Sequence, residues 1–472
     1  MTTPGGPGGQ WPHQQGGFPP PSGGGYGDQQ YQYPQQYPAN GPQQQPYYPQ
    51  QQGAFPVPPA GPPTRRRRGL VIGLVVALVV AAGAVGSWFA FRQSDSVAAG
   101  AATPTDAAMS FATSFGSGDV VGLLSALTPG EAALLTDPLV ESTNELKRLG
   151  VVKPDADPRN LTGLEIQTAN LTFDESQAEQ VNDHLTITKL TGGTITVTAD
   201  LSALPFADEY LDAIMADAGV TSPEEGRRTQ TVDIGEVVRA GGEPLRIATV
   251  KVGDEWYPSL FYSVADYALA DLGEQWPQQP IAANGAASPN EAVQQLVQAA
   301  LDSDITRVIE LLPPDEMGVL QDLGPLLVDA VGSATPTGAQ LTKLETETSE
   351  VAGGTRATVV ALEVEIPGEG TFSLTKDGDC YQLTVQDQSD QLCADQLSAL
   401  VEEQAGADVP DAARQAISNI GTSVLQQGLG VVTTEVDGKH YVSPVRTMTE
   451  LGMTFLRGME PADFKTMLEG GF

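Results

Sequence analysis

Residues 288–304 read SPNEAVQQLVQAALDSD, and residues 103–119 read TPTDAAMSFATSFGSGD, with similar residue types in the same order. Each stretch begins with a hydroxyl side chain, a proline and then an acid, which is the pattern of a capped helix start. Apolar residues follow at helical spacing in both, so each predicted helix buries one face. These apolar residues are Ala107, Ala108, Phe111 and Phe115 in the first stretch and Ala292, Val293, Leu296 and Ala300 in the second.

Both copies continue alike after this helix. Asp119 and Asp304 are each placed to cap a second short helix, and TPGEAALL and PPDEMGVL then begin a third. The third helices carry matching acids, Glu131 and Glu316. Beyond them the hydrophobic period changes from near four to two, which indicates strands. In the first copy we expect a Gly-Gly turn at 192–193 to separate two of these strands.

Each copy also ends in a strand, a tight turn, a second strand and a closing helix. Trp256 and Tyr257 in the first copy stand where His440 and Tyr441 stand in the second. The offset between the copies is 185 residues at the start and 184 at the end, so the repeat covers a whole folding unit. We therefore expect an α+β fold of two tandem domains, each with helices followed by an antiparallel sheet.

The repeat sets the expected domain boundaries. From the N-terminus, the expected units are a tail at 1–64, a basic flank and transmembrane helix at 65–92, a linker at 93–103, a first repeat at 104–272, a linker at 273–287, a second repeat at 288–458 with a helical insert at 395–428, and a C-terminal tail at 459–472.

The segment before the repeats differs from them in composition. Residues 1–64 consist almost wholly of Gly, Pro, Gln and Tyr, so we expect a disordered tail. Residues 69–91 hold no ionisable side chain and as a helix would extend about 34 Å, enough to cross a lipid bilayer. A cleaved signal peptide is the alternative, which so long an apolar run disfavours. Four arginines immediately precede this run: Arg65, Arg66, Arg67 and Arg68. By the positive-inside rule the tail is then cytoplasmic, and the repeats lie outside a cell membrane that the chain crosses once.

Charge is unevenly distributed along the chain. The whole sequence carries 24 basic and 59 acidic residues, a net charge of −35, whereas residues 1–91 hold four Arg and one Asp. The rest of the chain therefore has a net charge of −38. We expect no nucleic-acid partner, because nucleic acid requires clustered Lys or Arg. A solubilising acidic surface is one interpretation, and attraction to cationic surroundings is the other.

Cys380 and Cys393 are the only cysteines, and both follow the predicted membrane span, on the side where disulfides persist. The sequence between them reads as a strand, a polar turn at 387–390 and a short return, so we predict a disulfide that closes a hairpin. We expect no metal or cofactor, because His184 and His440 have no Cys or second His at ligand spacing.

The order of elements, with the endings GDEWYPS and DGKHYVS, resembles the nuclear-transport-factor-two-like (cystatin-like) cone domains of membrane-anchored actinobacterial cell-envelope proteins. The resemblance covers residues 104–272 and 289–458, and it implies two cones, each a curved sheet wrapped against a long helix. The inserts at 203–226 and 395–428 depart from that family. Such cones include enzymes and binding modules, so the fold alone does not decide the function.

Few residues form a pattern typical of catalysis. Ser373 and Lys376 have the spacing of a serine acyl-enzyme motif, but on the predicted strand residues three apart face opposite sides. Asp302 and Asp304 begin like a calcium loop, but Arg307 stands where that loop needs glycine, so we predict a helix start.

The remaining candidates are histidines and aromatic residues. We interpret His184 and His440 as structural, because the sequence shows no partner that would position either for acid–base chemistry, and we expect no titratable constellation shared by the two repeats. Trp256, Tyr257, His440 and Tyr441 are candidates for lining a ligand pocket, with a role in the core as the alternative.

Two functional hypotheses follow. The first is a non-catalytic, single-pass membrane protein that presents two cone-like domains to an envelope protein partner as a scaffold. The second is a carrier or sensor that binds a small apolar or glycan ligand in a cone cavity.

Overall fold

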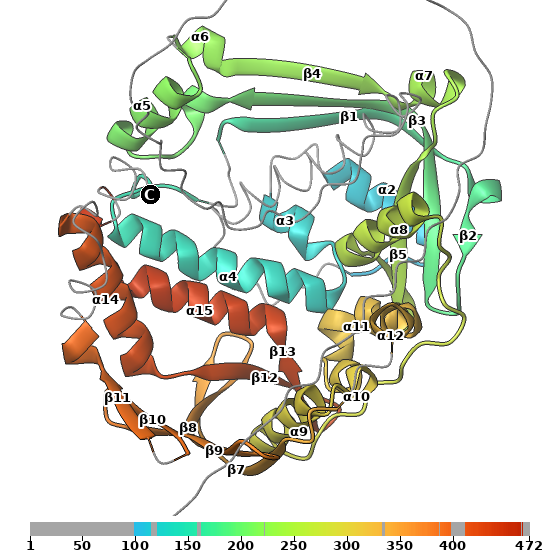
Figure 1. Ribbon diagram of the computed structural model, residues 1–472. Coiled ribbons are helices and arrows are strands. Elements are labelled where there is room, and N and C mark those ends of the chain that lie inside the picture. Colours follow the sequence, from blue (N-terminus) through green and yellow to red (C-terminus); the bar gives the residue numbers. More distant parts are fainter. Residues whose placement is uncertain are drawn as a thin grey trace, which may run out of the picture. The chain divides into compact units, whose positions relative to one another are not determined.

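Each repeat contains one antiparallel sheet, and the two sheets share the same central strand order (Figure 1). The computed structural model describes residues 99–114, 120–157, 162–220, 222–332, 336–386, 388–397, 411–463 and 465. The predicted tail and transmembrane segment lie outside these residues. No helix within the described ranges is long and apolar enough to cross a membrane.

The first repeat begins with helices and continues into a sheet of six strands. Its described elements are α2 (Pro104–Ser114), α3 (Val120–Ser125), α4 (Pro129–Arg148), β1 (Leu164–Phe173), η3 (Glu175–Gln177), β2 (Glu179–Gln180), β3 (Leu185–Asp200), η4 (Leu201–Ala203), α5 (Asp208–Asp217), α6 (Pro223–Gly226), β4 (Arg227–Asp233), α7 (Ile234–Arg239), β5 (Leu245–Val252), β6 (Glu255–Pro258) and α8 (Leu260–Leu272). In the sheet β1, β3, β5 and β6 are neighbours in that order, and β2 and β4 also pair with β3.

The second repeat follows the same plan with a sheet of seven strands. Its described elements are α9 (Pro289–Leu301), α10 (Ile305–Glu310), α11 (Pro314–Asp322), α12 (Gly324–Val331), β7 (Gln340–Val351), β8 (Gly354–Ile366), β9 (Gly370–Asp377), β10 (Cys380–Val385), β11 (Gln388–Cys393), η5 (Ala394–Gln396), α14 (Asp411–Gln427), β12 (Gly430–Val436), β13 (Lys439–Ser443) and α15 (Pro444–Gly458). The strand order is β11, β10, β9, β8, β12 and β13, and β7 also pairs with β8.

The pattern of strand pairing is similar in the two repeats. β3 pairs with β1, β4 and β5, just as β8 pairs with β7, β9 and β12. The predicted strand, turn, strand and closing helix is β5, β6 and α8 in the first repeat and β12, β13 and α15 in the second. The expected α+β class with curved antiparallel sheets is therefore confirmed, and the described part of the chain packs as one compact unit.

The expected turn at Gly192–Gly193 is wrong. These residues lie inside the single long strand β3, which turns through a corner there (Figure 1). The register between β1 and β3 shifts at this point, between Ala169/Thr194 and Thr172/Gly192. Gly193 has a φ of 107°, and a Cβ atom there would lie 2.8 Å from Cα of Leu171. Two glycines thus allow a bulge that bends the strand and does not reverse it.

The predicted disulfide between Cys380 and Cys393 is confirmed, and it joins directly paired residues of the β10–β11 hairpin. The turn is shorter than expected, because β10 pairs through Val385 with Gln388 and leaves two residues between the strands. Closing a loop of 13 residues stabilises the fold by about 3 kcal/mol in the loop-entropy model. Within the expected helical insert at 395–428 the described helix is α14, and residues 398–410 lie outside the described residues.

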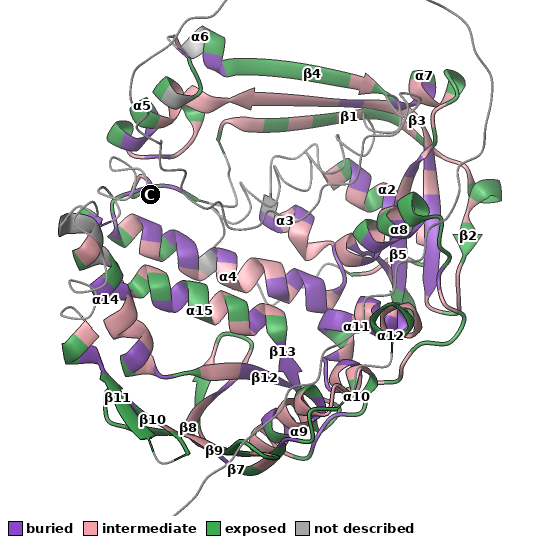
Figure 2. Cartoon of the chain, viewed as in Figure 1, coloured by how far each residue is buried: buried purple, intermediate pink, exposed green. Residues whose placement is uncertain are grey.

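The predicted capped helix starts are also confirmed. The hydroxyl of Thr103 accepts the N–H of Asp106 at 3.1 Å, and the hydroxyl of Ser288 accepts the N–H of Glu291 at 3.2 Å. Asp304 caps α10 in the same way, as expected for a helix start and not a calcium loop. α2 and α9 contact the sheets of their repeats, and both helices carry buried residues (Figure 2).

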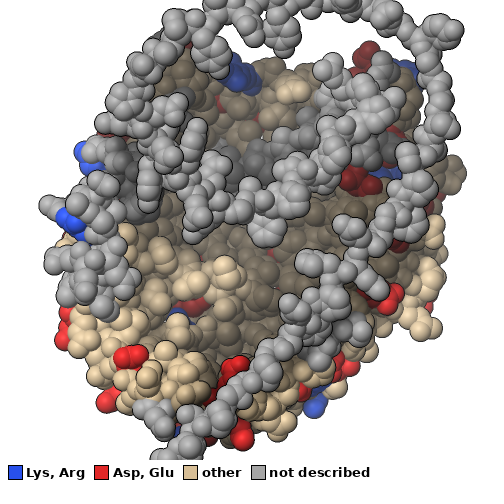
Figure 3. All heavy atoms as spheres, viewed as in Figure 1, with Lys and Arg blue, Asp and Glu red and all other residues tan. Residues whose placement is uncertain are grey.

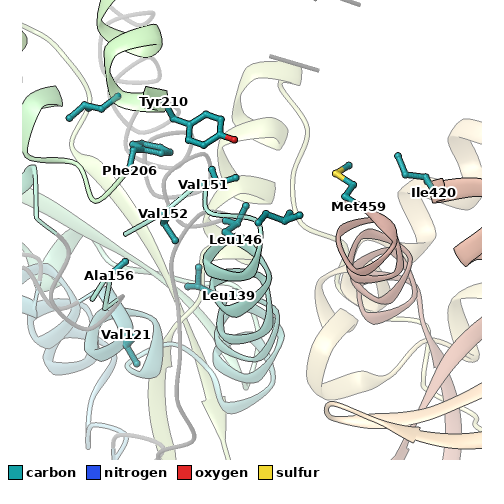
Figure 4. Packing of buried hydrophobic residues seen from close by; sticks show 12 residues of the cluster. Val121, Leu139, Leu146, Val151, Val152, Ala156, Phe206, Tyr210, Ile420 and Met459 are labelled. Carbon is teal, nitrogen blue, oxygen red and sulfur yellow. The ribbon is translucent and has the colours of Figure 1, made fainter. Parts of the chain in front are cut away.

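The two repeats pack together through their helices. α4 of the first repeat lies along α15 of the second, while α11 contacts both α4 and α8 (Figure 1). A hydrophobic cluster at the C-terminal end of α4 includes Leu146, Val151 and Tyr210, together with Ile420 of α14 and Met459 (Figure 4). Met459 belongs to the expected C-terminal tail, so at least the start of that segment is packed against the helices.

The expected linker at 273–287 is also packed. Trp276 is buried, stacks on Tyr262 with ring centroids 5.6 Å apart, and donates its indole N–H to Asp266 at 3.0 Å. Ile281 lies against Gly324, and its N–H donates to the carbonyl of Gln321 at 2.9 Å. The chain between the repeats is therefore packed against α11 and α12.

Candidate functional site

A cavity of about 600 Å³ lies where the two repeats meet. Its polar walls come from the start of α4, the start of α8, the loop before β3 and α11. Apolar side chains complete it, among them Val250, Phe261, Ile281 and Val319. A volume of this size, with apolar walls and a few convergent polar groups, is typical of a small-molecule site.

A buried carboxylate stands in this cavity wall in each repeat. Glu131, 3% exposed, accepts hydrogen bonds from the Ser259 hydroxyl and from the N–H of Leu260 at 2.7 Å. Glu316, also 3% exposed, accepts the Ser443 hydroxyl at 2.5 Å. Each acid thus joins the third helix of its repeat to the N-terminus of the closing helix, where the helix dipole favours negative charge. The expectation that the repeats share no titratable constellation is therefore wrong.

The contacts between the repeats are reciprocal. Asp137 of α4 lies 3.5 Å from the guanidinium of Arg446 in α15. Asp322, which matches Asp137 in the repeat, accepts the hydroxyl of Tyr262 in α8 at 2.6 Å, and Tyr262 matches Arg446. The same two positions therefore meet twice across a pseudo-twofold axis, as in an isologous dimer interface.

His184 also joins this site. Its Nε2 lies 2.8 Å from Oδ2 of Asp322, which is 4% exposed and belongs to the other repeat. The predicted structural role is consistent with this pair, but its partner lies 138 residues away, so the local sequence gave no sign of it. The hydrogen bond to Asp322 raises the pKa of His184. The stability that the His184–Asp322 pair contributes is therefore complete below the pKa of His184 in the unfolded chain. It is lost as the pH rises through the pKa of His184 in the folded protein.

Burial dominates the electrostatics of the other groups. Desolvation raises the pKa of Glu131 to about 7, although its hydrogen bonds to Ser259 and to backbone N–H groups oppose this shift. Desolvation and the nearby Asp322 also raise the pKa of Tyr262. At neutral pH Tyr262 is consequently a hydrogen-bond donor, and Glu131 is close to the midpoint of its titration.

Substituting Glu131 with glutamine should remove part of the pH dependence of stability. Because the folded pKa of Glu131 is raised, the wild-type free energy of unfolding should fall between about pH 4.5 and pH 7, by up to about 1.4 kcal/mol per pH unit from this group. Glutamine keeps the shape and cannot ionise, so the fall in the free energy of unfolding should become shallower. The remaining slope comes from other groups whose pKa the fold raises, among them His184 and Glu316. Urea unfolding at a series of pH values measures this. If the free energy of unfolding of Glu131→Gln falls with pH as steeply as that of the wild type, Glu131 is not buried.

A second cavity of about 270 Å³ lies inside the second repeat, between β8, β12, α14 and α15. It is lined mainly by apolar side chains such as Val359, Val431 and Leu451. Arg356, 9% exposed, also borders it and donates to Gln427 and to the carbonyl of Gly428. Its Nε has no hydrogen-bond partner among the described residues.

The four aromatic candidates lie elsewhere. Trp256 and His440 form matching backbone bridges, to Ala101 and to Ala286. The rings of Tyr257 and Tyr441 pack closely on Gly100 and Gly285. A Cβ atom added at Gly100 would lie 2.6 Å from the ring of Tyr257, and one added at Gly285 would lie 2.7 Å from the ring of Tyr441. None of these four residues is among those lining the cavities above. Their shared contacts hold the entering chain of each repeat against its last strand.

Three further observations concern metal ligands, surface charge and the serine motif. The described residues contain no group of three or more His, Cys, Asp or Glu that could hold a metal ion. On the face shown in Figure 3, the visible acidic side chains are scattered and not gathered in one patch. Ser373 and Lys376 lie on β9, opposite Thr384 and Tyr381 of β10, as expected for a strand.

Comparison with protein-family models, with curated proteins and with solved structures finds no match for this chain.

Proposed function

We propose that this protein is a membrane-anchored, non-catalytic carrier or sensor that holds a small ligand between its two repeats outside the cell. The observation that carries the proposal is the cavity of about 600 Å³, because its walls come from both repeats and combine apolar side chains with hydrogen-bonding groups. The two repeats are proposed to be tandem cone-like domains of the nuclear-transport-factor-two-like kind, which the matching strand pairing supports.

Membrane anchoring is proposed from the apolar run at 69–91 and the arginines before it. A non-catalytic role is supported by the contacts of the polar groups in the cavity wall. The Ser259 hydroxyl is bound to Glu131, and His184 and Tyr262 both bind Asp322, so these groups brace the interface between the repeats.

Filling the cavity tests the proposal. Ala133 borders the cavity from α4, whereas Ala268 is exposed on α8 and borders neither cavity described above. Full-length protein would be isolated from membranes of its own host in lipid nanodiscs and weighed by native mass spectrometry. We expect a bound small molecule on the wild type and on the control Ala268→Trp, and its loss from Ala133→Trp.

The same experiment separates the proposal from its rival. A wild type without a bound molecule, or a molecule that remains in Ala133→Trp, would contradict a ligand between the repeats. The first result would favour the other function expected from the sequence, display of the two domains to an envelope protein partner, which needs no occupied cavity.

A ligand inside the second repeat is a second candidate. The mainly apolar wall with the guanidinium of Arg356 at its border favours an apolar molecule with one hydrogen-bond acceptor. In the experiment above, such a ligand would remain in Ala133→Trp and be lost from Val359→Trp, which narrows the smaller cavity.

A further inference from the structure

The two repeats differ at one position beside the cavity. In the second repeat Arg446 donates through Nε to Glu316 at 2.5 Å, so that buried carboxylate has a cation beside it. In the first repeat the matching position is Tyr262, whose hydroxyl is directed to Asp322. Glu131 therefore has the serine partner of its counterpart and also accepts the N–H of Leu260, where the second repeat has Pro444, which has no N–H. Unlike Glu316, Glu131 has no ion-pair partner among the described residues.

The position at which Glu131 lacks a cationic partner lies in the wall of the cavity. Glu131, Tyr262 and Asp322 all border it. Ser259, which donates its hydroxyl to Glu131, accepts the backbone N–H of Tyr262 at 3.1 Å, and the Tyr262 hydroxyl donates to Asp322 at 2.6 Å. Phe261 and Tyr262 also supply aromatic rings near Glu131, and such rings attract cations. The titratable groups that share the wall with Glu131 and Tyr262 are Asp315, Glu316, Asp322, His184, Lys251 and Arg446. Carboxylates outnumber the basic groups of this wall, so it favours a cation over an anion.

We propose that the cavity between the repeats binds a small organic cation, an ammonium or amidinium group on an apolar body, whose charge lies against Glu131 as that of Arg446 lies against Glu316. This inference rests on the proposed function and adds the class of ligand. The apolar body would pack on Val250, Ile281 and Val319.

The protonation of Glu131 gives this site a pH dependence. Its pKa of about 7 means that a proton occupies the carboxylate below neutral pH and must leave before a cation can pair with it. Binding should therefore tighten as the pH rises from about 6 to about 8, provided that the ligand keeps its own charge over this range.

Benzamidine and benzamide are suitable probes, because they have the same shape and only benzamidine is charged near neutral pH. Calorimetric titration of the full-length protein at about pH 8 should show that benzamidine binds at least about tenfold more tightly than benzamide. Glu131→Gln should abolish this preference and the pH dependence of benzamidine binding. The matched control Glu347→Gln, at an exposed position on β7, should change neither.

A second variant tests the same point from the opposite direction. Tyr262→Arg places in the first repeat the residue that the second repeat has, so its guanidinium should pair with Glu131 and exclude benzamidine. Equal binding of the two probes, a preference that remains in Glu131→Gln, or unchanged benzamidine binding by Tyr262→Arg would overturn the cationic ligand. A host-derived molecule that Ala133→Trp excludes and benzamidine does not displace would leave the proposed function intact and remove only this ligand class.

Discussion

Substituting Arg446 with methionine should lower the free energy of unfolding by about 3–5 kcal/mol. Arg446 and Glu316 are both buried, at 8% and 3% exposed, and they are joined by a direct ion pair. Methionine fills a similar volume but leaves the carboxylate with only the Ser443 hydroxyl as a side-chain partner. Desolvation already raises the pKa of Glu316, and Arg446 opposes that shift. The loss should therefore be larger at pH 8 than at pH 5, where protonation relieves the buried charge.

Urea unfolding of the full-length variants measures this effect, and two further variants define its cause. Arg457, about one-third exposed, pairs with Glu141 and Glu450, so Arg457→Met should cost only about 0–1 kcal/mol. The double variant Arg446→Met with Glu316→Gln removes both charges and should recover most of the stability. If Arg446→Met is no more damaging than Arg457→Met, Glu316 is not buried as the structure places it.

The sequence was sufficient to predict features that local patterns encode. The helix starts at Thr103 and Ser288 follow from capping residues before an apolar period, and the hairpin closed by Cys380 and Cys393 follows from strand alternation. Each depends on residues within about one element of one another, where capping and strand periodicity act.

The site was harder to predict because its pairs come from opposite halves of the chain. Asp322 meets Tyr262 and His184 across 60 and 138 positions, and no local pattern in a single sequence reports such contacts. One signal was present, however. Glu131 and Ser259 recur as Glu316 and Ser443 at the repeat offset, and a hydroxyl and an acid retained together in both copies could have been interpreted as a pair.

The corner in β3 shows a different difficulty. A Gly-Gly pair between two alternating segments is equally compatible with a hairpin turn and with a bent strand. The choice depends on β1, which continues past the bend and pairs on both sides of it. Tertiary pairing, which the local sequence does not contain, therefore decides between the two conformations.

Gly130→Ala should destabilise the protein by about 2–3 kcal/mol, although alanine normally favours a helix over glycine. Gly130 lies in the first turn of α4, and a Cβ atom there would lie 2.0 Å from the carbonyl oxygen of Asp315 at the start of α11. That contact is with backbone and cannot rotate away, so the two matching helix starts would have to separate.

The matched control is Gly452→Ala, an exposed position in α15 where a Cβ atom would meet nothing within 4 Å. There the same substitution should stabilise the protein by about 0.5–1 kcal/mol, because only the backbone entropy of the unfolded chain changes. Urea unfolding of both variants should give opposite signs, and faster amide hydrogen exchange in α4 and α11 of Gly130→Ala would locate the damage at the junction of the repeats. Two stabilised variants would mean that the starts of α4 and α11 do not meet, and the cavity beside them would lose the wall that both repeats build.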